Sequence, residues 1–294
     1  MLAETYRAAR PEDVPEMVAV YLAASRDMYA RSGLSAPVPS AAAMQLAYEH
    51  IRSTGVFRVA ESGGRIIAIA GAVLRDRLWF LSAFWALPEV QRQNIGMPLL
   101  REVWHEGAAA GATTFFTWAS PDLTALASYM KLGMLPGYGI FVFRGIPEHL
   151  PPVPSSYQPG PLEHQVATAL DLHVRGTRRE VDHRFWAGPA GLRGRQVLRD
   201  GEVAGYYYLD RGTIGPAAWT DATEAAAVIG VALREAAEGA GESGRVTLAV
   251  PGVNHAALRI ALAAGLRLTV HSQFLTSASF GRLECYLPSG PLLY

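Results

Sequence analysis

The sequence predicts a mixed α/β fold that occurs twice in tandem along the chain. In each half a hairpin is followed by a strand, a helix, a strand, a helix and a strand, and this recurring order indicates an internal repeat. The halves also share a spacing, because Asp122 and Gly133 lie as far apart as Asn254 and Gly265. Between the halves, residues 147–161 contain six prolines, which predicts an extended linker and not a packed element. We therefore expect domains over 1–146 and 162–294.

The first half begins with a strand over Thr5–Ala9. A helix follows that opens at Pro11 and runs to about Ala24, because Pro and acidic residues are typical of a first helical turn. Pro37–Ser40 interrupts the chain, and Ser62-Gly63-Gly64 has the composition of a hairpin turn. The remaining expected elements are a helix over 41–53, hairpin strands over 56–60 and 65–73, a buried strand over 78–86, a helix that ends at Gly111, a strand over 113–119, a helix over 121–132 closed by Gly133, and a strand over 137–144.

The second half repeats this order. Asp200-Gly201 is a strong hairpin signal, and Asp221 or Thr223 suits the N-cap of an Ala-rich helix. The expected elements are a helix over 162–174, a hairpin over 196–208, a strand over 214–219, a helix over 221–238, a strand over 246–250, a helix over 254–263 closed by Gly265, and a strand over 269–277. The aromatic residues expected to build the second core are Phe185, Trp186, Tyr206, Tyr207 and Tyr208.

Composition excludes several classes of protein. The 294 residues carry 26 basic and 26 acidic side chains, and this balance argues against a nucleic-acid partner. The single cysteine, Cys285, excludes an intramolecular disulfide and is expected to be a small buried side chain. No apolar run approaches a membrane span, and the polar N-terminus lacks the core of a signal peptide. We expect a soluble, cytoplasmic protein with no membrane partner.

The segment Leu87–Leu100 carries the strongest functional signal. A polar turn, Gln91–Gly96, connects the buried strand over 78–86 to the helix that follows. Such a connection directs backbone N–H groups and the positive end of a helix dipole at one position, which favours phosphate. A turn that wraps an anion needs backbone at positive φ or in close contact with the ligand, and Asn94 and Gly96 both tolerate these demands.

This segment resembles the acyl-CoA loop of the GNAT N-acetyltransferases, whose pattern is Gln/Arg-x-x-Gly-x-Gly/Ala after a strand and a proline. Pro88, Gln91 and Gly96 match, whereas Asn94 stands where the family usually has glycine. The resemblance covers nearly the whole chain as two tandem GNAT-like folds, although it is specific only in the first half. It implies acetyl-CoA as co-substrate and no metal. The residues implied to bind it are Ala86, Leu87, Gln91, Arg92, Gln93, Asn94, Ile95, Gly96, Met97 and Asp122: the strand end for the pantetheine amides, and the N–H groups of 93–97 for the pyrophosphate.

The family's second signature, Asn-x-x-Ala-x-x-x-Tyr-x-x-x-Gly-Phe, appears as Asp122-x-x-Ala125-x-x-x-Tyr129-x-x-x-Gly133-Met134. The resemblance implies that Tyr129 is the general acid that protonates the departing thiolate. The alternative is a tyrosine of an amphipathic helix that packs on the sheet. In the second half Ala261 takes the tyrosine position, and 215–226 has no such loop. We therefore expect the second domain to be non-catalytic.

A general base is harder to identify. Many members of the family use a Glu of the strand before the loop, but residues 78–88 contain no carboxylate. The candidates elsewhere are Glu49, His50 and Asp27, or a water relay, and each side chain can equally belong to a solvated surface. A thioester and an amine held together need mainly positioning, so proximity can carry much of the rate.

Other polar groups are less specific. The histidines show no metal-ligand spacing. Arg175, Arg178, Arg179 and Arg184 form either a solvated face, the interpretation we favour, or a site for an anionic group.

The sequence therefore predicts an acetyl-CoA-dependent N-acetyltransferase for a small-molecule amine, with a homodimer possible. Two alternatives stay open from other classes: a module that binds CoA without transfer, and a structural protein. Within the enzymes, the tandem family of mycothiol synthase has a similar architecture, but its active machinery lies in the second half.

Overall fold

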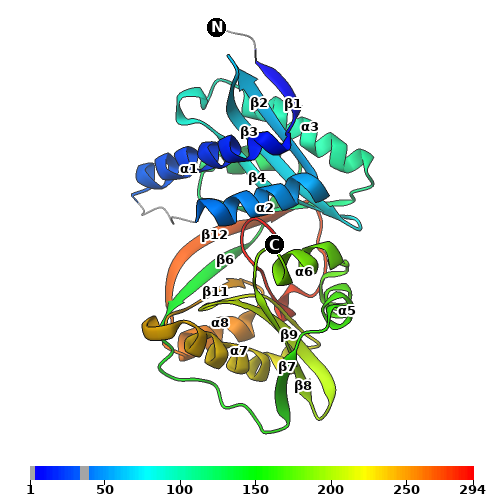
Figure 1. The fold of residues 1–294 in the computed structure, drawn as a ribbon, viewed down its shortest axis with the longest axis vertical. Helices are drawn as coiled ribbons and strands as arrows, with labels where there is room; N and C mark the ends of the chain where they lie inside the picture. Colours follow the sequence, from blue (N-terminus) through cyan, green and yellow to red (C-terminus); the bar gives the residue numbers. More distant parts are fainter. Residues whose placement is uncertain (1–3, 34–39) are drawn as a thin grey trace. The chain divides into compact units, whose positions relative to one another are not determined.

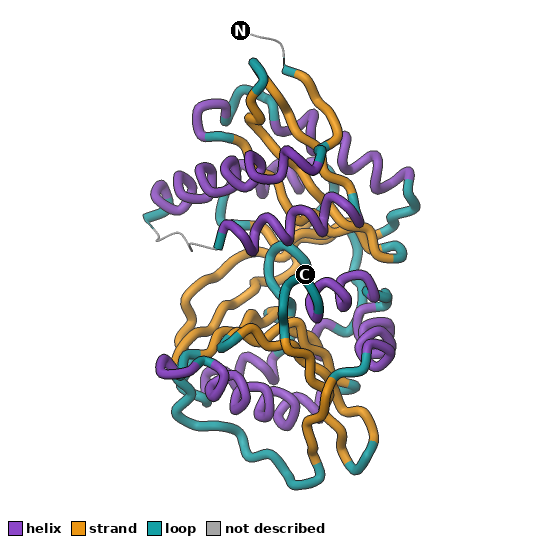
Figure 2. The backbone as a smooth tube through the Cα atoms, in the orientation of Figure 1, coloured by secondary structure: helices purple, strands orange, loops and turns teal. Residues whose placement is uncertain are grey.

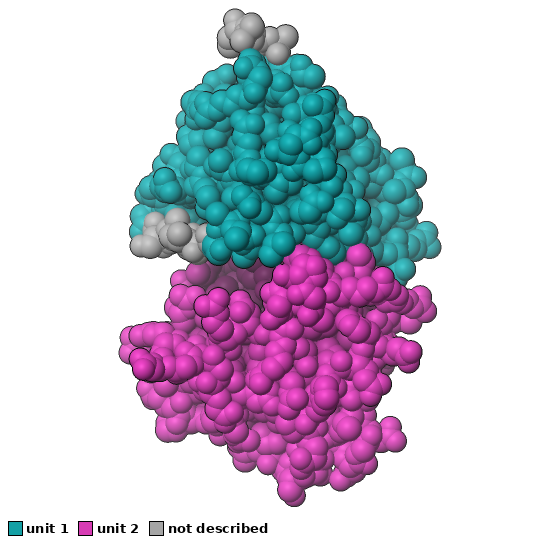
Figure 3. Space-filling model, in the orientation of Figure 1, with its two compact units in different colours: residues 1–117, 122–134 teal, residues 118–121, 135–294 magenta. Residues whose placement is uncertain are grey.

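The computed structural model describes residues 4–33 and 40–294. The chain forms two compact units, 1–117 with 122–134, and 118–121 with 135–294 (Figure 3). The expected boundary at 146 differs from this division. The strand β6 (Leu135–Gly145) pairs with two strands of the second unit, so it belongs to that unit's sheet.

The first unit is an α/β structure on one sheet with the strand order β1-β2-β3-β4-β5. All neighbours are antiparallel except β4 and β5, which are parallel. The strands are β1 (Thr5–Ala8), β2 (Val56–Ser62), β3 (Arg65–Arg75), β4 (Leu78–Ala86) and β5 (Thr114–Ala119). The helices are α1 (Val14–Arg31), α2 (Ala41–Thr54), α3 (Gly96–Ala109) and α4 (Leu123–Lys131), with 3₁₀ turns at Pro11–Asp13 and Pro88–Val90.

Helices cover both faces of this sheet. Figure 1 shows α1 and α2 in front of the strands and α3 behind them. The side chains agree, since Trp85 of β4 packs against Tyr21 of α1, whereas Trp79 of β4 packs against Trp104 of α3. The core therefore lies on both sides of β3 and β4, whose residues are almost all buried.

The helix α1 is longer than the sequence analysis expected, because it ends at Arg31 and not near Ala24. Its buried stripe continues through Met28 at helical spacing, so the last turns are also held by packing. The break expected at Pro37–Ser40 lies mostly outside the described residues, and Ser40 is the N-cap of α2.

The second unit has the strand order β12-β6-β11-β10-β9-β8-β7, with β13 paired to β10. Its strands are β6, β7 (Tyr157–Pro161), β8 (Arg193–Arg199), β9 (Glu202–Asp210), β10 (Thr213–Trp219), β11 (Val246–Pro251), β12 (Arg267–Thr276) and β13 (Tyr286–Leu287). Its helices are α5 (His164–Arg175), α6 (Glu180–Ala187), α7 (Ala225–Gly239) and α8 (His255–Ala263), with 3₁₀ turns at Ala222–Glu224, Gly241–Ser243 and Leu283–Cys285. Figure 2 shows α5 beside α6 and α7 beside α8 as two separate pairs.

Three segments of this unit differ from the sequence analysis, and one of them is the helix α6, which was not predicted. The stretch 147–161 is not wholly an extended linker, because its last residues form β7, which pairs with β8. Proline has no N–H to donate, so it is tolerated in an edge strand, which pairs on one side only. β7 is an edge strand of this kind. The strand β13 was not predicted, since a two-residue strand has no periodicity to detect. The expected aromatic core is confirmed by the burial of all five side chains.

Candidate acyl-CoA site

The strand β4 loses its partner on one side before it ends. Its parallel pairing with β5 runs from Leu78, opposite Thr114, to Leu81, opposite Thr117. A β-bulge follows, between the pairs Ala72–Leu81 and Gly71–Ala83. In the described part of the chain, residues 82–86 of β4 pair with β3 alone. The second half of β4 therefore presents one edge whose backbone groups are open to another extended chain.

The register shows which backbone groups face this open edge. Leu87 donates its N–H to the carbonyl of Ile67 in β3, and its own carbonyl accepts from Val90. Because bonding alternates along an antiparallel ladder, the N–H and C=O groups of Ala86 and Phe84 point away from β3. Ala86 therefore has an outward N–H, while its carbonyl already accepts from Nε2 of Gln91 at 3.0 Å, and both backbone groups of Leu87 are bonded within the fold. Phe84 also presents outward backbone groups, a position that the sequence analysis did not consider.

The cradle loop, residues 91–96, connects this edge to α3. Arg92 and Asn94 both have positive φ, +65° and +62°. The positive φ predicted at Asn94 is confirmed, and Asn is one of the few residues that adopts it readily. Among the described residues, the N–H groups of Asn94, Ile95, Gly96 and Met97 have no backbone partner outside α3. They surround the N-terminus of a helix, where the dipole favours an anion.

Gly96 does not have positive φ, which is one of the two reasons that the sequence analysis gave for glycine here. A Cβ at this position would lie 2.9 Å from Cζ of Phe84. Glycine is therefore needed because the first turn of α3 packs directly on the Phe84 ring. The same ring contacts Tyr129 of α4 edge-on, with centroids 6.0 Å apart. Phe84 thus joins the cradle loop and the predicted acid in one cluster within the first unit.

Tyr129 keeps its proton at neutral pH. Its side chain is buried, and burial, helped by the negative charge of Asp122, raises the pKa of the phenol well above 10. The hydroxyl consequently stays protonated at neutral and mildly alkaline pH, and the same shift makes it a weaker proton donor than a free tyrosine. The burial agrees both with the predicted acid and with the alternative of a tyrosine that only packs on the sheet.

Asp122 caps α4. Its Oδ1 accepts hydrogen bonds from the N–H groups of Thr124 and Ala125, both at 2.9 Å. Asp in place of the family's Asn therefore keeps the capping function. Its Oδ2 lies 3.7 Å from Nη2 of Arg31, and the same nitrogen donates to Oε1 of Gln91 at 3.3 Å. Sequence reasoning missed Arg31, since nothing local to α1 indicates a contact sixty residues away.

The base candidates are tied to other groups. Glu49 accepts two hydrogen bonds from Arg52, which hold the pKa of its carboxyl below the usual range. Asp27 pairs with Arg31 at 2.8 Å. His50 is buried and has its own partners. None of these side chains belongs to the cluster around Phe84.

The corresponding part of the second unit is closed. β10 pairs in parallel with β11 at only two positions, Thr213 and Ile214. Beyond them, Ala217 and Ala218 of β10 pair with β13. The chain itself therefore occupies the edge that corresponds to the open edge of β4.

The residues of α8 agree with this closure. Asn254, the residue at the position of Asp122, caps α8 and donates from Nδ2 to the carbonyl of Tyr286 at 3.1 Å. Ala261, at the position of Tyr129, is buried and offers no acid.

The arginines around α5 and α6 form a solvated face only in part. The interpretation holds for Arg178 and Arg184, which are exposed, and is wrong for Arg175 and Arg179, which are each only 2% exposed. Arg175 lies over the rings of Tyr286 and Tyr294, 4.7 and 5.4 Å from their centroids. Periodicity could not show this, because the covering rings come from the distant C-terminal segment.

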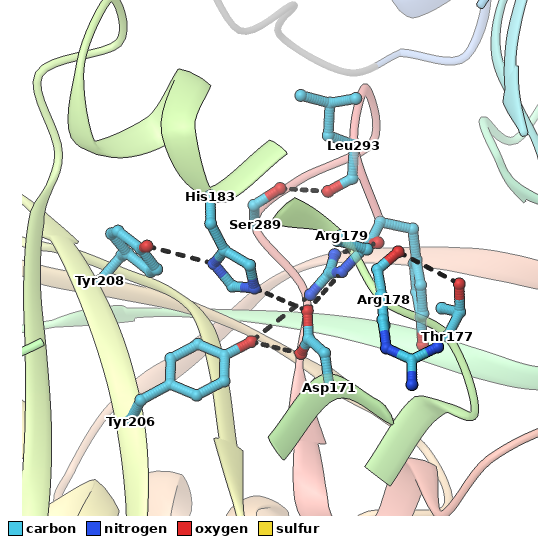
Figure 4. A network of polar contacts seen from close by, with 10 residues as sticks. Asp171, Thr177, Arg178, Arg179, His183, Tyr206, Tyr208, Ser289 and Leu293 are labelled. Atoms are coloured by element: carbon cyan, nitrogen blue, oxygen red, sulfur yellow. Dashed lines mark hydrogen bonds and ion pairs between the residues drawn. The ribbon is translucent and has the colours of Figure 1, made fainter. Parts of the chain in front are cut away.

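Arg179 belongs to a buried network centred on Asp171 (Figure 4). Asp171 accepts from Arg179 Nε at 2.7 Å, Tyr206 at 2.6 Å and His183 Nε2 at 2.9 Å. A carboxylate only accepts, so Nε2 of His183 carries the proton and Nδ1 faces the hydroxyl of Tyr208 at 3.1 Å. Nη1 of Arg179 also donates to the carbonyl of Tyr294 at 2.8 Å, and we interpret the network as structural.

Two further observations bear on chemistry. The described residues contain no group of three or more His, Cys, Asp or Glu side chains placed to hold a metal ion. Within the same ranges, none of the helices combines the length and apolar character needed to cross a bilayer. Cys285 is buried, as predicted, and burial raises the pKa of its thiol to about 11.

Comparisons with known proteins agree with this architecture. A putative acetyltransferase from Pyrococcus horikoshii superposes with a TM-score of 0.77 at 16% identity, covering 99% of this chain and 96% of the other. A GCN5-related N-acetyltransferase from Sphaerobacter thermophilus gives 0.61 at 16% identity, covering 94% and 96%. A tandem GNAT protein from the clavulanic acid biosynthesis pathway gives 0.61 at 15% identity, covering 93% and 98%. At such identities these similarities establish the fold, which is two GNAT-like folds in tandem.

One family model matches part of the sequence. Residues 19–134 match the model of the acetyltransferase (GNAT) family. No curated protein matches the sequence. The match assigns residues 19–134 to the GNAT family, and the similarity to tandem GNAT structures extends the fold to the second unit.

Proposed function

We propose that the protein is an acetyl-CoA-dependent N-acetyltransferase whose active site lies in the first unit and whose acceptor is a small-molecule amine. One observation carries the proposal: the ring of Phe84 contacts both the start of the cradle loop's helix and Tyr129. An anion cradle and a protonated phenol are thereby held on one side of a strand whose edge is open.

The residues present fit the donor. The open-edge groups of Phe84 and the N–H of Ala86 would hydrogen-bond the amides of pantetheine, and the N–H groups of 94–97 would hold the pyrophosphate. Bound acetyl-CoA supplies an activated thioester. In the transfer, the amine nitrogen forms a bond to the acyl carbon, the carbon–sulfur bond breaks, and Tyr129 donates its proton to the departing sulfur. Water accepts the proton of the amine and reprotonates Tyr129.

The second unit would not catalyse. β13 covers the edge of β10, and Ala261 cannot donate a proton. These observations favour the N-terminal arrangement over one in which the second half is active.

A second function has one observation in its favour. The open half of β4 bears no carboxylate, and Glu49 and Asp27 are paired with arginines. This would suit a protein that binds CoA without transferring an acyl group. Replacement of Tyr129 by Phe separates the two functions. An enzyme that uses Tyr129 would lose acetyl-transfer rate, whereas a protein that only binds CoA would show no transfer in either form.

Thermal unfolding with and without acetyl-CoA tests the proposal. A ligand at about a hundred times its dissociation constant stabilises by roughly 2.7 kcal/mol, which is a shift of a few degrees in a domain of this size. We compare the wild type with Asn94→Asp and Asn94→Gly. Both replacements tolerate positive φ, but only Asp places a negative charge in the cradle.

The wild type and Asn94→Gly should shift, whereas Asn94→Asp should lose most of the shift. Absence of a shift in the wild type at saturating acetyl-CoA would refute the proposal. Equal shifts in all three proteins would place the ligand elsewhere.

A further inference from the structure

Arg31 ends α1 and contacts two parts of the candidate site. Its Nε donates to Asp27 one turn earlier in α1, at 2.8 Å. Its Nη2 donates to Oε1 of Gln91 in the cradle loop, at 3.3 Å, and lies 3.7 Å from Oδ2 of Asp122 at the start of α4. One side chain therefore connects the end of α1, the cradle loop and the helix that carries Tyr129.

Gln91 transmits this contact to β4. While its Oε1 accepts from Arg31, its Nε2 donates to the carbonyl of Ala86 at 3.0 Å. Both ends of the amide are thus engaged, which holds the first residue of the loop against the open edge of the strand. The following residues, Arg92 to Asn94, are exposed.

We propose that Arg31 is a positioning residue of the acyl-CoA site, and this inference rests on the proposed function. Arg31 acts by geometry and not by adding net charge, because Asp27 and Asp122 balance it. The planar guanidinium reaches several acceptors at fixed angles, which lysine cannot reproduce. A loop held in place before binding loses less conformational freedom when the ligand arrives, so affinity rises.

The test compares Arg31→Gln, Arg31→Lys, Gln91→Ala and the double variant Arg31→Gln/Gln91→Ala. Acetyl-CoA affinity is measured by calorimetric titration, and transfer by steady-state kinetics. We expect Arg31→Gln to raise Kd and KM for acetyl-CoA about two- to fivefold, the scale of an exposed ion pair. The kcat at saturating acetyl-CoA should stay within about twofold, because Arg31 does not contact Tyr129. Arg31→Lys should give an intermediate Kd.

The double variant tests the route of action. If Arg31 acts through Gln91, the double variant should bind no more weakly than the weaker single variant. If the increase in Kd of the double variant instead equals the product of the increases in the two single variants, Arg31 does not act through Gln91. A change in kcat alone would also contradict a positioning role.

Arg184→Gln is the matched control. Arg184 makes the same one-turn pair, with Glu180 at 3.1 Å, but in α6 of the second unit. It should leave Kd and KM unchanged. If the wild type binds acetyl-CoA and Arg31→Gln binds it equally well or more tightly, the role of Arg31 is refuted but the proposed function is not. Failure of the wild type to bind acetyl-CoA overturns the proposed function itself.

Discussion

Tyr129 combines two properties that a general acid needs, a proton it retains and a place beside the cradle. The raised pKa of the phenol keeps the group protonated below pH 10, so its own titration should not shape the rate between pH 6 and 9. Tyr129→Phe keeps the ring that packs on Phe84 and removes only the proton.

We therefore predict that Tyr129→Phe lowers kcat by about a hundredfold while acetyl-CoA affinity changes little. Steady-state rates across pH 6–9 check this. A variant as fast as the wild type would remove Tyr129 from the mechanism.

Gly96 contributes both to the packing of the first unit and to the candidate acyl-CoA site. Gly96→Ala brings a methyl group to 2.9 Å from the Phe84 ring, and overpacking of this kind typically costs about 1–3 kcal/mol. We predict a lower thermal midpoint and weaker acetyl-CoA binding, measured by unfolding with and without the ligand. Gly160→Ala is the control, because a Cβ there meets nothing within 4 Å and no positive φ is needed. Equal midpoints for the two variants would contradict the packing role.

At the scale of elements, the Asp171 network ties α5, α6 and β9 together in the second unit. Burial by itself would raise the pKa of Asp171, but the charge of Arg179 and the hydrogen bond from His183 outweigh it and hold the pKa below its ordinary value. A carboxyl with a depressed pKa contributes stability above its unfolded value, near pH 4, and that stability is lost as pH falls toward the folded value.

Asp171→Asn should therefore destabilise the second unit at pH 7 by about 3–5 kcal/mol, because it leaves the Arg179 charge buried without its partner. It should also weaken the loss of stability between pH 4 and pH 2. Denaturant unfolding at several pH values measures both effects. Asp210→Asn, an exposed control paired only with its neighbour Arg211 at 3.7 Å, should change neither. A small effect of Asp171→Asn at pH 7 would show that the network adds little.

At the scale of the whole molecule, two similar folds differ in whether the strand edge is open. The edge of β4 is open, whereas that of β10 is covered by β13, whose Tyr286 carbonyl is held by Asn254. We predict that the chain binds one acetyl-CoA, with a stoichiometry near one in calorimetric titration. Asn94→Asp should abolish this single event. A stoichiometry of two would mean that a second acetyl-CoA displaces β13 from the edge of β10.

The sequence alone determined most of the element order and the backbone conformation of Asn94 in the cradle loop. Hairpin turns, helix caps and the positive φ of Asn94 depend on neighbours within a few residues, so local patterns predict them. The loss of the tyrosine at Ala261 is also visible in the sequence, because the caps at Asp122 and Asn254 fix the alignment of the two helices.

Only the tertiary structure decided which backbone groups face outward and which side chains are covered. Three examples depend on how distant segments pair. They are the hydrogen bond from Leu87 to Ile67, the pairing of β6 within the second sheet, and the pairing of β13 with β10. A one-residue change of register reverses every such assignment, so no local pattern encodes them. The contact of Arg31 with Gln91 and the burial of Arg179 have the same origin. Each depends on partners far along the chain that only packing brings together.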